Sequence, residues 1–330
     1  MTRSAEDASG IPTDWRSPDG VELSHVLRAD QAPAFSAMSA IDALGHRVLS
    51  RAAEYKAASG RDKLVGLALL RRAVTTFVGV RTLLEASSVQ PALIVARAQF
   101  EILLSIRYLV HGGRRSTSFE TPTHARQRET RARYYLAASV RTGIYRRQAL
   151  LDGAEGARRV PKSERRRELE EELRAERARL DRYYRTQNRR FGPLRCYPSG
   201  SRKPRYYDER TWYSFGFLKD RVYSVKALAR RFRMESYYFI LYSPLSKFGH
   251  AGESDYDLEI GDEKAAVLSP HDPTFFPVVA YWSCAWQRLS LTYAAKAYCP
   301  ASMPDLQRTE AGLREALDHL GEEAATLVLH

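Results

Sequence analysis

The sequence of 330 residues contains only 3 cysteines, and their positions do not form the paired spacings of a zinc site or a disulfide framework. We therefore expect Cys196, Cys284 and Cys299 to be reduced thiols in the core. There is no Gly-rich phosphate loop, no His-Glu-x-x-His sequence and no Gly-x-Ser-x-Gly sequence. The sequence therefore predicts neither a metal site nor a bound cofactor, and any functional site must be assembled from scattered side chains.

Long hydrophobic runs without charge are also missing. The most apolar segment, residues 91–110, carries Arg97, Glu101 and Arg107, and each ionisable group near the centre of a bilayer costs roughly 3 kcal/mol. The beginning of the chain has no basic stretch followed by an apolar run, which is the pattern of a secretory signal. We expect no membrane span and a cytoplasmic location.

The composition is that of a folded, basic protein. Hydrophobic residues make up 44% of the chain and aromatic residues 11%, which excludes wholesale disorder and collagen-like architectures. The 52 Lys and Arg residues against 39 Asp and Glu residues leave a formal charge of +13. Between Arg114 and Arg190 there are 22 basic and 11 acidic residues, so this segment holds +11 of that charge. Clustered cations attract polyanions because binding releases counterions.

Apolar residues recur at helical spacings of three and four along most of the chain. The expected helices cover residues 35–55, 62–86, 91–111, 122–151, 163–190, 220–232, 235–248, 275–298 and 304–320. Asp62 is expected to cap the second helix, and no period-two strand pattern persists. The sequence predicts an all-α protein: one helical bundle from which a charged helix or helical hairpin projects.

The expected organisation is a single bundle domain at 31–320 between two tails. Residues 1–30 contain Gly and Pro without periodicity and predict a flexible N-terminal arm, and residues 321–330 predict a C-terminal tail. A charged excursion at about 114–210 is inserted in the bundle. Its helix at 163–190 interleaves Glu and Arg, which favours an exposed helix that docks a protein partner or a second copy of the chain.

Two polar stripes are candidates for a site. Arg97 and Glu101 lie one helical turn apart, and we expect them to form a buried ion pair that either fixes helix register or serves a polar pocket. The other stripe, spaced by four in the segment YFILYSPLSKFGH, consists of Tyr238, Tyr242, Ser246 and His250. A histidine in such a stripe either satisfies core hydrogen bonds or acts as a general acid or base.

The runs ARAQFEILLSIRYLV and SYYFILYSPLSKFGH resemble an uncharacterised bacterial family of unknown function. That family shows an Arg-x-x-Phe-Glu helix, a Trp-containing segment and a Tyr-rich helix that ends in Leu-Ser-x-x-x-His. The matching positions are Arg97, Phe100, Glu101, Trp212, Tyr238, Tyr242, Leu245, Ser246 and His250. The resemblance covers about 61–252.

More distantly, the chain is similar to HEPN domains, which are helical bundles. This resemblance implies a metal-independent ribonuclease or a nucleotide-binding protein, in stress response or phage defence. The HEPN pattern places an Arg before the catalytic His at a spacing that is absent before His250.

The basic segment is a separate candidate for nucleic-acid binding, because its cations suit phosphates and its rings suit base stacking. The residues concerned are Arg126, Arg128, Arg131, Arg133, Tyr134, Tyr135, Arg146 and Arg147. The alternative is a set of salt-bridged, solvated helices.

Two functions remain open at this point. In the first, the protein binds or cleaves RNA or nucleotides: His250 is the general acid or base, Ser246 and Tyr242 position the substrate, and Glu101 orients or polarises it. Arg97 then steadies Glu101 or a phosphate. In the second, the protein is a non-catalytic interaction or regulatory protein, and the same side chains form a structural polar core.

Overall fold

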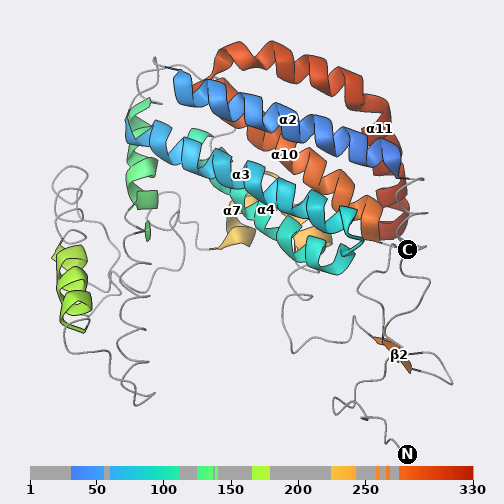
Figure 1. The fold of residues 1–330 in the computed structure, drawn as a ribbon, viewed down its shortest axis with the longest axis horizontal. Coiled ribbons are helices and arrows are strands. Elements are labelled where there is room, and N and C mark those ends of the chain that lie inside the picture. The colour runs from blue at the N-terminus through green and yellow to red at the C-terminus, as the bar shows by residue number, and fades with distance from the viewer. Residues whose placement is uncertain are drawn as a thin grey trace, which may run out of the picture.

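The computed structural model describes residues 31–55, 60–111, 125–136, 138–139, 166–178, 224–242, 258–260, 265–267 and 275–329 of the chain. The long helices are α2 (Ala32–Glu54), α3 (Arg61–Glu85), α4 (Val89–His111), α10 (Phe276–Tyr298) and α11 (Met303–Leu329). They lie side by side along the long axis of the molecule (Figure 1). The predicted all-α bundle is confirmed.

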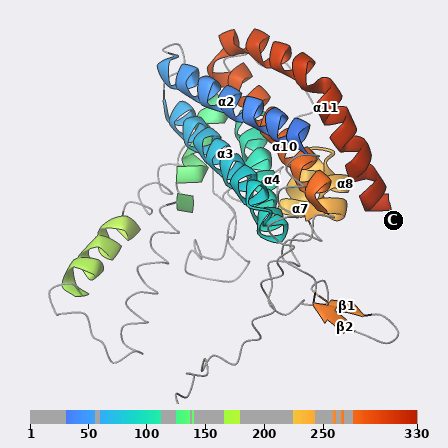
Figure 2. The same cartoon turned by 45° about the vertical axis from the view of Figure 1, so that its right-hand side comes forward.

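Helix α10 lies at the centre of this bundle, because it packs against α2, α3, α4 and α11 (Figure 2). Apolar and small residues recur on all its sides, and Cys284, Trp286 and Leu291 are almost completely buried. Burial raises the pKa of the Cys284 thiol to about 12, so this cysteine stays protonated and unreactive. Cys284 and Cys299 are free and buried, as predicted, and Cys196 lies outside the described residues.

A polar layer crosses the centre of the core between α4 and α10. The Nε2 group of Gln99 donates to the backbone oxygen of Ser283 at 3.0 Å and lies 3.5 Å from Oε1 of Gln287. All three residues are fully buried. Hydrogen bonds at fixed positions in an apolar interior favour one register between two helices, so this layer helps to align α4 with α10.

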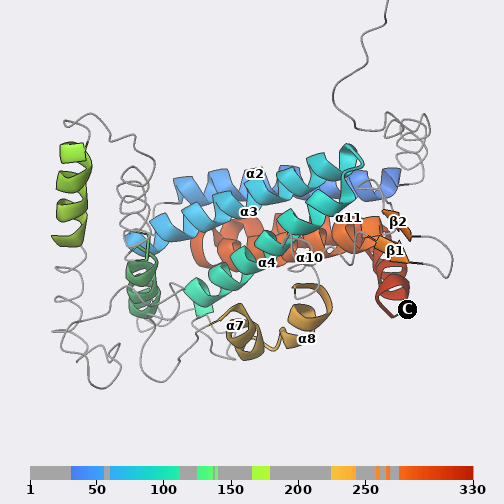
Figure 3. The same cartoon turned by 90° about the horizontal axis from the view of Figure 1, so that it is seen from below.

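A short helical segment packs under α4 (Figure 3). It consists of α7 (Val225–Arg231), α8 (Glu235–Tyr237) and the π-helix η3 (Tyr238–Tyr242). The hydroxyl oxygen of Ser224 caps α7 by accepting from the backbone N–H of Ala227 at 3.1 Å. Arg107 on α4 places its guanidinium 4.6 Å from the ring centre of Phe232, just after α7, and 5.5 Å from that of Tyr293 on α10. Arg107 therefore fastens this segment to the bundle.

Two expectations about elements differ from the structure. Between the expected helices at 235–248 and 275–298, where no strand was expected, the structure has an antiparallel pair of strands, β1 (Leu258–Ile260) and β2 (Ala265–Val267). Strands of 3 residues are too short to show a period-two pattern. Helix α11 continues to Leu329, beyond its expected end at 320, so the described part of the expected tail is helical. The expected N-terminal arm at 1–30 lies outside the described residues.

Residues 166–178 form the described part of the expected charged helix. This helix stands apart from the bundle in both Figure 1 and Figure 3. Arg166 and Glu170 form an ion pair one turn apart, with the arginine Nε 3.1 Å from the carboxylate. Leu169 and Leu173 are buried, so one edge of this helix is covered, whereas we expected it to be exposed throughout.

Among the described residues, no helix has both the length and the apolar character needed to cross a membrane. The expectation that the chain has no spanning helix is therefore confirmed for that part of the sequence.

Candidate functional site

Side chains from α4 and η3 meet at one cluster on the underside of the bundle. The hydroxyl group of Tyr242 donates to Oε1 of Glu101 at 2.7 Å and accepts from Nη2 of Arg97 at 3.1 Å. The Nε atom of Arg97 lies 3.8 Å from the same carboxylate oxygen. The two polar stripes therefore meet at these three residues, although they are far apart in the sequence.

The cluster lies at the surface of the bundle rather than in its interior. The side chain of Arg97 is 26% exposed and that of Glu101 is 44% exposed, so the expected burial of this ion pair is wrong. The reason is that the neighbouring positions of α4, rather than these two, face α10. A pair exposed to this degree avoids most of the desolvation cost of a buried pair and remains accessible to a ligand.

The tyrosine hydroxyl is the most constrained member of the cluster. Burial and the hydrogen bond to Glu101 raise the pKa of Tyr242 to about 12, although Arg97 opposes the shift. The hydroxyl is thus protonated at neutral pH and acts as a donor to Glu101. The guanidinium of Arg97 also lies over the Tyr242 ring, 4.8 Å from its centre, so the arginine is held by both the ring and the hydroxyl.

Aromatic rings fix the position of Tyr242 against the bundle. Its ring lies 5.9 Å from that of Phe100, which in turn lies 5.1 Å from Trp286 at the centre of the core. Tyr238 stacks on Tyr242 with ring centres 5.0 Å apart. Both tyrosines belong to the π-helix, and single π turns within helices are frequent at functional sites.

The remaining candidates of the catalytic set, Ser246 and His250, lie outside the described residues. That Ser246 and His250 form one site with Glu101 therefore stays a prediction. Tyr242 is the last described residue before them, four residues ahead of Ser246 in the sequence.

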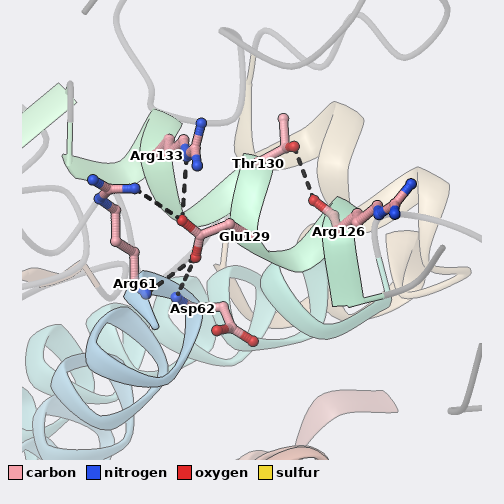
Figure 4. A network of polar contacts seen from close by, with 6 residues as sticks. All are labelled: Arg61, Asp62, Arg126, Glu129, Thr130 and Arg133. Carbon is pink, nitrogen blue, oxygen red and sulfur yellow. Dashed lines mark hydrogen bonds and ion pairs between the residues drawn. The ribbon is translucent and has the colours of Figure 1, made fainter. Parts of the chain in front are cut away.

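The helix at 125–136 carries most of the residues expected to bind nucleic acid. Its Glu129 points at the beginning of α3 (Figure 4) and accepts from the backbone N–H groups of Arg61 and Asp62 at 3.0 and 3.2 Å. The side chains of Arg61 and Arg133 donate to its other oxygen at 3.1 and 3.2 Å. Burial raises the pKa of Glu129, but these hydrogen bonds outweigh that effect and lower it overall.

Glu129 therefore caps α3 from another helix. The expected N-cap, Asp62, does not cap the helix: the N-cap position belongs to Gly60, and no side chain of that residue is available for capping. Asp62 instead accepts from Nε of Arg128 at 3.3 Å. The sequence could not show this arrangement, because the capping carboxylate lies in a distant segment.

Arg131 of the same helix contacts the end of α4. It is buried, and its guanidinium donates to the backbone oxygens of Leu109 and Val110 at 2.8 and 3.1 Å. These are carbonyl groups of the last turn of α4, which lack partners within the helix. The helix at 125–136 thus holds the start of α3 through Glu129 and the end of α4 through Arg131.

Several basic residues that were expected to bind nucleic acid instead make contacts within the protein. Arg128 and Arg131 are engaged by groups of the bundle and Tyr134 is buried, so these residues hold the helix in place. Arg133 pairs with Glu129 of its own helix, the residue that caps α3. Arg126 is exposed and points away from Glu129 (Figure 4).

Three further residues were expected to bind nucleic acid. Tyr135 is partly exposed. Arg146 and Arg147 lie outside the described residues.

Some residues of interest were not singled out from the sequence. Phe239 on η3 is 49% exposed, and Nζ of Lys226 lies 4.4 Å from its ring centre. Arg107 appeared only as a charge that argues against a membrane span. The sequence signal that could have pointed to Phe239 is the aromatic-rich run at 237–242. Within the described part of the chain, no three His, Cys, Asp or Glu side chains are grouped as metal ligands.

The model of a family described as a family of unknown function, DUF5677, matches residues 63–264. The chain belongs to DUF5677. The expected membership of an uncharacterised family is confirmed, and the matched range is close to the expected 61–252. The DUF5677 range includes the Arg97 cluster and the helix at 125–136, whereas α2, α10 and α11 lie outside it. No curated protein and no solved structure matches the chain.

Proposed function

We propose that this DUF5677 protein binds single-stranded RNA or nucleotides and cleaves a phosphodiester bond at the Arg97 cluster, as a HEPN-like protein of the bacterial cytoplasm. The observation that supports the proposal is the cluster itself: a guanidinium and a carboxylate, both partly exposed, are held together by one tyrosine hydroxyl. A role in stress response or phage defence follows from the resemblance to HEPN domains.

Each side chain has a role that suits its surroundings. Glu101 is the most exposed of the three described members, and it orients or polarises the reacting group. Tyr242 stays protonated and positions that carboxylate. Arg97 steadies Glu101 or contacts the phosphate, and His250 supplies the general acid or base, with Ser246 beside it in the sequence stripe.

A second function has an observation of its own. Arg97, Glu101 and Tyr242 hydrogen-bond or ion-pair with one another, which is also what a structural polar cluster does when it fastens η3 to α4. In that case the protein is a non-catalytic interaction or regulatory protein. The charged segment at 163–190 then docks a protein partner or a second copy of the chain.

Replacement of His250 separates the two functions. We expect His250→Gln to lower the rate of cleavage of single-stranded RNA, measured with the full chain in the presence of EDTA, by about 10²- to 10⁴-fold. The matched control is His319→Gln, because His319 is 72% exposed on α11 and should leave the rate unchanged. Both variants should melt at the temperature of the unmodified protein.

Two results would decide against cleavage by this cluster. If His250→Gln cleaves RNA at the unmodified rate, His250 is not the general acid or base. If the unmodified protein cleaves no RNA but pulls down a partner or forms a dimer through 163–190, the interaction function is the correct one.

A further inference from the structure

An unbroken row of rings with a cation at each end runs along η3 beside the Arg97 cluster. Lys226 lies 4.4 Å from the ring centre of Phe239, and Phe239 lies 5.5 Å from Tyr238. Tyr238 lies 5.0 Å from Tyr242, which lies 4.8 Å from the guanidinium of Arg97. The row therefore consists of three rings in contact, with a cation at each end.

All three rings of this row belong to the π-helix η3. Its wider turn keeps Tyr238 and Tyr242 nearly parallel, with 25° between the ring planes, while Phe239 meets Tyr238 at 84°. Phe239 is 49% exposed, whereas Tyr242 is buried at the bundle end. The row thus begins in solvent at Phe239 and ends in the cluster at Tyr242.

Exposure of a single large apolar side chain is ordinary at a protein surface. Phe239 is distinguished by its neighbours, because a solvent-exposed aromatic ring lies between a lysine and a tyrosine stack that leads to an arginine. Single-stranded nucleic acid carries the groups that complement both parts of the row: flat bases that stack on rings and phosphates that pair with cations. A purely anionic polymer would use the cations alone.

We propose that Phe239 is a base-stacking residue for single-stranded RNA, with Lys226 as a phosphate contact beside it. The inference rests on the proposed function, because the row would carry the strand toward Arg97 and Glu101. The long, flexible side chain of Lys226 lets its ammonium group exchange the Phe239 ring for a phosphate when a base occupies that ring.

Binding of a fluorescein-labelled 12-nucleotide single-stranded RNA to the full chain tests the proposal by fluorescence anisotropy. We expect Phe239→Ala to weaken binding by about 5- to 150-fold, which is the usual effect of removing one stacking ring. Phe239→Trp should bind as well as the unmodified protein, and Phe239→Leu should bind as poorly as Phe239→Ala. The matched control is Leu64→Ala, which truncates another exposed apolar side chain on α3.

Inorganic polyphosphate of the same charge serves as a ligand without bases. Phe239→Ala should leave its affinity unchanged, whereas Lys226→Gln should weaken both ligands and reduce the slope of log affinity against log salt by about 1. Circular dichroism and the melting temperature check that each variant is folded.

The possible failures are distinguishable. If the unmodified protein binds RNA and Phe239→Ala or Phe239→Leu binds it equally well, base stacking at Phe239 is wrong while the proposed function stands. If Phe239→Ala weakens the binding of RNA and of polyphosphate to the same extent, the loss does not depend on bases. Base stacking at Phe239 is then wrong as well. If the unmodified protein binds no RNA, the proposed function fails and this inference fails with it.

Discussion

Single residues decide how closely the helices of this bundle approach. Gly66 on α3 faces the ring of Tyr298 on α10, and a Cβ atom at this position would collide with that ring. Tyr298 is almost fully buried in the core. The missing side chain at Gly66 therefore sets the distance between α3 and α10 at this level of the core.

We expect Gly66→Ala to lower the free energy of unfolding by about 1–3 kcal/mol, because the core must expand around Tyr298. Gly312 on α11 is the matched control, since it is also a helical glycine but no atom lies within 4 Å of an added Cβ. Gly312→Ala should raise stability by about 0.5–1 kcal/mol through helix propensity alone. Urea denaturation measures both. Stabilisation by Gly66→Ala would contradict the packing described for Tyr298.

The Arg97 cluster shows at the same scale what sequence can reveal about a site. The i, i+4 spacing of Arg97 and Glu101 indicated a shared face, and the structure places them together. The spacing could not show exposure, which depends on how α4 is rotated against α10. It also could not identify Phe239 as the exposed ring of η3, because neighbouring aromatic residues look equivalent in sequence.

At the scale of elements, the helix at 125–136 connects two helices of the bundle through hydrogen bonds. It caps the start of α3 with Glu129 and the end of α4 with Arg131, so one short helix satisfies orphan backbone groups of both. Two polar anchors thereby fix this helix against the bundle.

We expect Glu129→Gln to lower the free energy of unfolding by about 1–2 kcal/mol at pH 7, because the charged cap of α3 becomes a neutral one. The pKa of Glu129 is lowered in the folded protein. Its contribution is therefore complete above the ordinary carboxyl range and is lost as the pH falls through the lowered value. Hydrogen exchange of the backbone amides of Arg61 and Asp62 should accelerate in the variant, and the difference from the unmodified protein should shrink in acid.

Glu170→Gln is the control for this change. Glu170 also pairs with an arginine, but the pair is more exposed than Glu129 and lies within the single helix at 166–178. Its replacement should change stability by less than about 0.5 kcal/mol. Equal effects of the two variants would mean that Glu129 contributes only a surface ion pair.

Most helices were predictable because apolar residues recur at helical spacing, and α2, α3, α4 and α10 begin and end close to the expected residues. The exceptions have physical causes. The expected helix at 235–248 changes to π hydrogen bonding from Tyr238, just ahead of Pro244, and a period of 3.6 does not predict that change. The cap of α3 comes from a segment distant in sequence, so local motifs pointed to Asp62 instead.

At the scale of the whole molecule, the formal charge of +13 should make RNA binding fall steeply as salt rises. We expect the combined replacement of Arg126, Arg146 and Arg147 by Gln to reduce the slope of log affinity against log salt by about 2. Arg128, Arg131 and Arg133 are left intact in this experiment, because the first two hold the helix at 125–136 to the bundle and Arg133 pairs with Glu129.

The control replaces three exposed arginines elsewhere on the bundle, so that the net charge falls by the same amount. The residues are Arg71, Arg72 and Arg308. If both triple variants reduce the slope equally, the protein attracts RNA through its total charge and the basic segment has no special part in binding.

The central place of α10 has a practical consequence for anyone producing this protein in recombinant form. The DUF5677 match ends at residue 264, whereas α10 begins at Phe276. A truncated gene product that stops at the family limit would leave Phe100 without Trp286 and Gly66 without Tyr298, and would open the apolar sides of α3 and α4 to water. The family match therefore covers α3 and α4, whereas the helix that buries their apolar sides lies beyond its limit.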